Sequence, residues 1–203
     1  MTQSTLPQRL ALGMALGIAG LLAACSKTVT WEEEVLLNTG ETILVNKVVT
    51  FSIRGQAGNP ADQRYASDDI ETTSFKYQGK SYTYHGDADL LIIAISPQKV
   101  PVLLAAASSR DWYRRHTYKC VNPYYVMFIP DASGKEWTWP DRIEPWTYNL
   151  PTNLLLNRIH PVDTRKRFTM ADKLMEEYRQ DLRTLYFQKI DPLYISDICK
   201  GMK

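Results

Sequence analysis

The residues with the most obvious metal-binding chemistry lie just before a strongly apolar stretch of the chain. His85, Asp87 and Asp89 alternate, and Gly86 follows the first of them. Three ligands on one short stretch leave a coordination shell incomplete, so a metal site would need further donors from elsewhere. The same residues also make an ordinary turn before a strand. We therefore expect no metal site here, and no cofactor.

A second group of candidate residues combines basic and aromatic side chains within the segment 110–119. Guanidinium groups bind phosphates through paired hydrogen bonds, so this segment could contact lipid A phosphates or an acidic partner. The alternative is a solvated loop between two strands. The candidate binding residues of this segment are Trp112, Arg114, Arg115 and His116.

Two tryptophans form a third candidate binding group. Trp137 and Trp139 have the same parity on an expected strand, so their side chains share one face. Exposed indole faces could stack on the sugars of cell-wall glycans. The alternative is that both rings bury their large area in the core, as aromatic side chains more often do.

The sequence contains little that could support hydrolysis. It has no Gly-x-Ser-x-Gly elbow and no His-Glu-x-x-His pattern, and it has three histidines in all. Cys120 lies four residues after His116, but oxidation of the thiol would compete with a catalytic role. We expect no catalytic residue. An envelope hydrolase would need His85 to converge with Asp87, or His116 with Asp111.

The N-terminus carries a targeting signal. An apolar run over 10–24 follows a short segment whose charged residue is Arg9, a layout typical of a secretory signal peptide. Its end, Leu22-Ala23-Ala24-Cys25, resembles the lipobox of bacterial lipoproteins. The resemblance implies cleavage before Cys25, a lipid on that cysteine, and anchoring in the membrane. Ser26 in the next position implies the outer membrane of a Gram-negative envelope, with the protein facing the periplasm.

We therefore divide the chain into a signal peptide (1–24), a lipidated cysteine with a short tether (25–27) and one β-rich domain (28–203). The segment 1–24 carries one of the 24 basic residues, which leaves 23 bases against 22 acids. A nearly neutral body gives no electrostatic case for nucleic acid as a partner. Cys120 and Cys199 remain, and an oxidising periplasm favours a disulfide between them over two free thiols.

Two hairpins are expected early in the chain. Over 28–53 the apolar residues fall on odd numbers, with Glu33 and Lys47 among them. A turn centred on Gly40 would place these two charges opposite each other. A second hairpin turns between Tyr77 and Tyr82, and Gly79-Lys80 as its two-residue loop would be a type II′ turn.

Later segments complete a mainly β domain. The continuous apolar stretch 90–95 predicts a strand buried on both sides at the centre of the fold. Further strands are expected over 100–107, 124–129 and 136–139, and a proline-rich arm from 140 to 168 should lie over the core. Thr169 and Asp172 have the spacing of a helix cap, which predicts a helix near 169–187. The expected fold is a single antiparallel β-sandwich or partly open barrel with one C-terminal helix.

Three stretches resemble uncharacterised lipoproteins of Gram-negative proteobacteria, namely 30–35 (TWEEEV), 38–41 (NTGE) and 151–155 (PTNLL). This resemblance implies a location and no particular chemistry. Function therefore stays open among three classes. We expect a non-enzymatic binding or accessory component of the cell envelope, with an envelope protein or a glycan as its partner. The alternatives are a glycan- or lipid-A-binding module and an envelope hydrolase.

Overall fold

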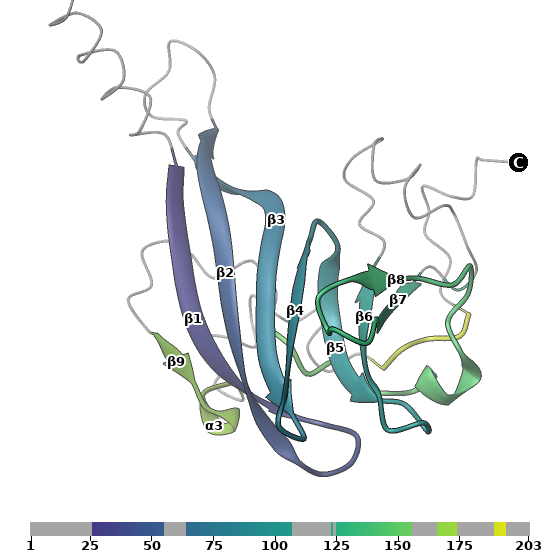
Figure 1. The fold of residues 1–203 in the computed structure, drawn as a ribbon. Helices are drawn as coiled ribbons and strands as arrows, with labels where there is room; N and C mark the ends of the chain where they lie inside the picture. The colour runs from purple at the N-terminus through teal and green to yellow at the C-terminus, as the bar shows by residue number, and fades with distance from the viewer. Residues whose placement is uncertain are drawn as a thin grey trace, which may run out of the picture.

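The structure is a computed structural model that describes residues 26–54, 64–106, 123, 125–155, 166–173 and 189–193. It confirms a mainly β fold with two sheets (Figure 1). The first sheet has the strand order β4-β3-β2-β1-β9, and the second has the order β5-β6-β7-β8. The strands of the first sheet are β1 (Ser26–Leu36), β2 (Thr42–Arg54), β3 (Arg64–Tyr77), β4 (Lys80–Gly86) and β9 (Arg167–Phe168). Those of the second sheet are β5 (Asp89–Ile95), β6 (Pro101–Ala106), β7 (Tyr125–Pro130) and β8 (Trp137–Thr138).

The two sheets share one apolar interior, as the sandwich prediction required. Val35 and Phe75 of the first sheet pack in the same cluster as Leu103 and Phe128 of the second. A second cluster joins residues of β1 and β2 to residues of β5, β6 and β7 in the same way. Both clusters also take residues from the arm that follows β8, which confirms that this arm lies over the core.

The first hairpin keeps the predicted inner face but has a different register. Val35 lies opposite Ile43 and Trp31 lies opposite Lys47, so the expected pairing of Glu33 with Lys47 is wrong. The cause is the turn. Gly40 has a φ of +86° and its N–H donates to the Leu37 carbonyl, so glycine ends the turn instead of standing at its centre. The register moves by two positions, and the parity of each face is unchanged.

The second hairpin turns one residue earlier than expected. Tyr77 pairs with Lys80, so the two loop residues are Gln78 and Gly79. Both have positive φ, +48° and +77°, which is the type I′ conformation and not type II′. The aromatic residues of the two strands still share one face, but their register differs: Phe75 lies opposite Tyr82, whereas a Gly79-Lys80 loop would have placed Tyr84 there.

Strand β5 is buried from Leu90 to Ile95, as its apolar run predicted, but it is the end strand of its sheet and not the centre. Asparagine side chains cover its open edge. Asn153 accepts from the N–H of Ile93 (2.9 Å) and donates to its carbonyl (2.9 Å). Asn38 does the same at Ile95, at 2.8 and 2.9 Å. A primary amide offers the donor and acceptor of a peptide group, so each side chain replaces one residue of a missing strand.

The outer edge of β4 is covered by the β7–β8 connection. The Thr83 N–H donates to the Gly134 carbonyl (2.9 Å), and Trp137 Nε1 donates to the Thr83 carbonyl (2.7 Å). These two bonds join the second sheet to the first at this edge. Buried or edge peptide groups are rarely left unpaired, which explains why an indole N–H is used here.

The one described α-helical segment, α3 (Met170–Lys173), begins where the sequence predicted. The Thr169 N–H donates to Asp172 Oδ2 (2.7 Å), and the Asp172 N–H donates to Thr169 Oγ1 (3.2 Å). This reciprocal pair is a capping box with Asp in place of Glu. The remainder of the predicted helix, 174–187, lies outside the described residues. A 3₁₀ turn, η3 (Pro145–Thr147), belongs to the arm.

Candidate functional site

The first sheet has two faces with different chemistry. Its inner face carries the odd-numbered residues of β1, β2 and the C-terminal part of β3, and four charged groups are associated with it. Its outer face carries the even-numbered residues of the same strands and is mostly hydroxyl, amide and carboxylate. Each face is a candidate site, and they are taken in turn.

Four charged side chains are buried between the inner face and the segments that cover it, each with 1% or less of its surface exposed. They are Glu33, Lys47, Glu71 and Lys173. They form two ion pairs between neighbouring elements. Lys47 Nζ lies 3.2 Å from Glu71 Oε2, and Lys173 Nζ lies 2.5 Å from Glu33 Oε2. Glu33 and Lys47, which were expected to pair with each other, thus have other partners: Lys47 pairs with a residue of β3 and Glu33 with a residue of α3.

Contacts with the covering arm complete this cluster. Lys47 Nζ donates to the Leu155 carbonyl (3.1 Å), and the Leu155 N–H donates to Glu33 Oε2 (2.9 Å). Lys173 Nζ also donates to the Asn153 carbonyl (3.0 Å). The cluster therefore fixes the position of residues 153–155 and of α3 on the sheet.

Electrostatics within the cluster favour a structural role. Burial lowers the pKa of Lys173 below its ordinary value, and the Glu33 carboxylate opposes that shift by attraction and hydrogen bonding. A buried ion pair gains little over a hydrophobic pair of the same size, whereas removing one partner leaves an uncompensated charge. Because all four side chains are enclosed, the cluster offers no access to a substrate.

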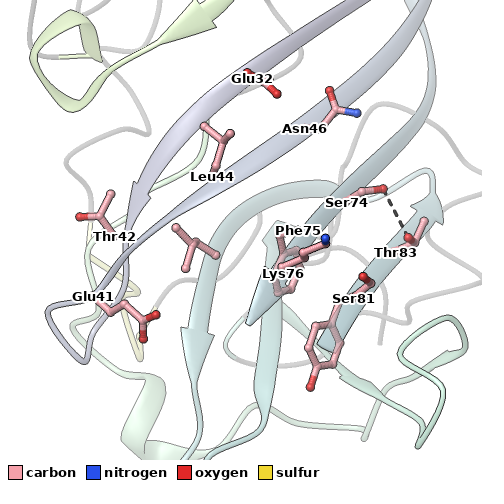
Figure 2. A pocket seen from close by; sticks show the side chains of 12 residues that line it. Glu32, Glu41, Thr42, Leu44, Asn46, Ser74, Phe75, Lys76, Ser81 and Thr83 are labelled. Carbon is pink, nitrogen blue, oxygen red and sulfur yellow. Dashed lines mark hydrogen bonds between the residues drawn. The ribbon is translucent and has the colours of Figure 1, made fainter. Parts of the chain in front are cut away.

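The outer face is hollowed where β1, β2, β3 and β4 lie side by side (Figure 2). The hollow has a volume of about 620 Å³, within the range of about 300–1,000 Å³ that is common for small-molecule sites. Its lining comes from all four strands and the first turn: Glu32, Glu41, Thr42, Ile43, Leu44, Asn46, Ser74, Phe75, Lys76, Ser81, Tyr82 and Thr83.

The hollow is a mixed contact surface, in which apolar side chains such as the exposed Leu44 lie among hydroxyl, amide and charged groups. Ser74 Oγ donates to Thr83 Oγ1 (3.4 Å), so two of its hydroxyls form one row across β3 and β4 (Figure 2). Glu32, Glu41 and Lys76 are the charged members, two acids and one base, so the lining carries one net negative charge at neutral pH. It contains neither imidazole nor thiol, and its hydroxyl, amide and carboxylate groups can hydrogen-bond a ligand.

Several predicted site residues lie outside the described residues. These are the lipidation site Cys25, the disulfide candidates Cys120 and Cys199, and the basic segment with Trp112, Arg114, Arg115 and His116. Asp111 is outside as well. The anchoring, the disulfide and the role of the basic segment remain predictions.

The two tryptophans of the third group are described, and each contacts one of two neighbouring rings, Tyr84 and Phe128. Trp137 is partly buried and meets Tyr84 edge-on, with ring centroids 6.2 Å apart. Trp139 contacts Phe128 edge-on at 5.8 Å and is 45% exposed. Trp139 is therefore the more exposed of the two tryptophans.

The histidine considered for metal binding makes a different contact. His85 is exposed, and its Nδ1 lies 2.9 Å from Thr72 Oγ1 on the neighbouring strand. Among the described residues, no group of three or more His, Cys, Asp or Glu side chains is arranged to hold a metal ion.

Comparison with known proteins found no match to a family model, a curated protein or a solved structure. In the described part of the chain, no helix is both long and apolar enough to cross a membrane.

The hollow was not predicted from the sequence. A signal for it exists, because most even positions of the first hairpin carry polar residues, as do Ser74 and Lys76 before the second turn and Ser81 and Thr83 after it. Alternation identifies a solvent-facing side but not its curvature, which depends on the twist and the bulge between β2 and β3 near Val49 and Phe51.

Proposed function

We propose that this chain is a lipid-anchored, non-enzymatic binding or accessory protein of the Gram-negative cell envelope, and that the outer face of its first sheet contacts a partner through both polar and apolar side chains. The observation that carries the proposal is the hollow across β1–β4, which gathers hydrogen-bonding and apolar side chains from four strands on one exposed face.

The position of the proposed lipid supports this arrangement. Strand β1 begins at Ser26, the residue directly after Cys25 in the sequence. A lipid on Cys25 would therefore be joined to the sheet with almost no tether. Glu32, at the near end of the hollow, lies six residues along β1, which is about 20 Å at roughly 3.3 Å per residue. The hollow would then lie away from the bilayer surface and be open to the periplasm.

Site-specific photo-crosslinking in cells tests this surface. A photoreactive amino acid at Asn46 lies in the hollow, and the same group at Thr28 lies on the outer face of β1 outside its lining. We expect a discrete crosslinked product from position 46 that is absent from position 28. Equal products at both positions, or none at position 46, would contradict the proposal.

Anchoring is tested separately. Cys25→Ser should abolish incorporation of labelled fatty acid and leave a precursor that retains residues 1–24. Normal processing of this variant would contradict the lipid anchor while leaving the crosslinking result interpretable.

The glycan-binding alternative is favoured by one observation, the 45% exposure of Trp139. It predicts that purified cell-wall glycan sediments the wild-type protein and that Trp139→Ala reduces this binding at least several-fold. Sedimentation that is unchanged by the substitution would reject Trp139 as a sugar platform.

A further inference from the structure

Within the described residues, two buried polar atoms on β1 have no hydrogen-bond partner. They are the indole nitrogen Nε1 of Trp31 and the carboxylate oxygen Oε1 of Glu33. Trp31 is 1% exposed and Glu33 is fully buried. Other indoles in the described residues do have partners, since Trp137 Nε1 donates to a backbone carbonyl and Trp146 Nε1 donates to Glu144 Oε2, each at 2.7 Å.

An unsatisfied buried donor or acceptor costs about 1–3 kcal/mol, so two of them on neighbouring positions of one strand need an explanation. Trp31 and Glu33 are two residues apart and point to the same face of the sheet. Their backbone positions are about 6.6 Å apart at this spacing, and both side chains are long enough to reach a common point.

The two atoms have opposite requirements. The indole N–H can only donate, and the carboxylate oxygen can only accept while it is ionised. A bound anion would accept a hydrogen bond from the indole N–H but would be repelled by the carboxylate. A metal ion would bind the carboxylate but has no use for an indole N–H. The ligand that satisfies both is a small group that accepts and donates at once.

We propose that an ordered internal water molecule bridges Trp31 and Glu33. Its oxygen accepts the indole N–H, and one of its hydrogens is donated to Glu33 Oε1. Glu33 Oε2 already accepts from the Leu155 N–H and from Lys173 Nζ, so the water completes the hydration of this carboxylate inside the protein. Lys47 Nζ lies 5.8 Å from the centre of the Trp31 ring on the same face of the sheet.

Such a water connects the ion pair of α3 to the inner face of the sheet. Internal waters of this kind make about three hydrogen bonds to buried polar groups and are costly to remove. The cluster of four charges then has a fifth member that does not belong to the chain.

Water-selective nuclear Overhauser measurements on protein with ¹⁵N-labelled tryptophan test the proposal directly. The Trp31 indole proton should show a cross-peak to water with the sign of a long-lived complex. Trp137, whose indole proton points to the Thr83 carbonyl, is the matched control and should show none. The absence of a long-lived water signal at Trp31, or an equal signal at both indoles, would overturn the proposal.

A second measurement counts the internal waters. Oxygen-17 relaxation dispersion of the Trp31→Phe variant should show one long-lived water fewer than the wild type, because the donor is lost while the ring is retained. An unchanged count would overturn the bridging role. Should Trp31→Phe fail to fold, the nuclear Overhauser measurement on the wild-type protein still tests whether a water is bound at Trp31.

Discussion

The two sheets contribute different chemistry to the same interior. The first sheet places Glu33, Lys47 and Glu71 on its buried face, whereas every residue of β5 from Leu90 to Ile95 is apolar or small. In the second sheet, β5, β6 and the first four residues of β7 are buried on both faces almost throughout. In the first sheet burial is one-sided, and the arm and α3 supply the counter-charge and the backbone groups that the buried ions require.

This difference indicates two ways of holding a sandwich together. Apolar packing in the second sheet stabilises the buried interface but does not require any one side chain to lie against a particular neighbour. Ion pairs and their backbone contacts demand specific geometry, so we infer that the cluster around Glu33 determines where the arm and α3 lie. Such a role in specificity is a hypothesis for any buried ion pair and needs a direct test.

The largest expected effect comes from separating one ion pair. Lys173→Met should leave Glu33 as an unpaired buried charge and lower the free energy of unfolding by about 3–5 kcal/mol. Urea denaturation measures this loss. Lys76→Met, on the exposed outer face, is the control and should change stability by no more than about 0.5 kcal/mol.

The same comparison is sharpened by removing both charges. Glu33→Leu combined with Lys173→Met should be clearly more stable than Lys173→Met alone, because no buried charge is left without a partner. A double variant whose loss equals or exceeds that of the single variant would show that the pair is not energetically coupled.

A slightly smaller effect is expected in the second sheet. Leu103→Ala should cost about 3 kcal/mol through lost apolar contact and the cavity it leaves. Leu103→Met keeps most of the volume and should cost less than about 1.5 kcal/mol. Similar losses for both replacements would show that shape, and not burial, dominates at this position.

The connection between the sheets should be less sensitive. Gly134 has a φ of +75°, and a Cβ atom there would lie 2.7 Å from the Ser81 carbonyl oxygen. Gly134→Ala should therefore destabilise by about 1–2 kcal/mol from backbone strain, with an added cost from this contact. Gly79→Ala is a matched control, because its φ is +77° but the space around its Cβ is open. Equal losses of unfolding free energy in the two variants would show that the chain moves enough to avoid the contact with the Ser81 carbonyl oxygen.

The smallest effect concerns the exposed turn beside Gly134. The hydrogen bond from Ser133, with further ones from the backbone of the turn, lowers the pKa of Asp131 to about 2. The folded carboxyl binds its proton less readily than the unfolded one. Its contribution to the turn is therefore complete above the ordinary pKa of 3.8 and is lost as pH falls through 2. An NMR titration of Asp131 should show this, and Ser133→Ala should move the pKa upward. A pKa unaffected by the substitution would contradict the assigned cause.

Which residues face inward could be predicted without the structure, because alternation with a period of two is a local property of a strand. The same holds for the two hairpins, the buried run 90–95 and the start of α3. The errors lay at the turns, where a left-handed glycine at the end of one loop and a type I′ loop in the other moved the positions of the turns. When a turn is displaced by one residue, each side chain stays on the predicted face of the sheet, but every residue has a different partner on the neighbouring strand.

The sequence by itself determined that the protein is mainly β, which side chains of each strand are buried, and that Glu33 and Lys47 lie on an otherwise apolar face. Only the tertiary structure decided what those charges meet. Glu71, Lys173, Asn153 and Leu155 come from segments that are distant along the chain, and no local pattern records which of them will be adjacent. The hollow of the outer face has the same origin, since four strands must twist together before their polar residues enclose one space.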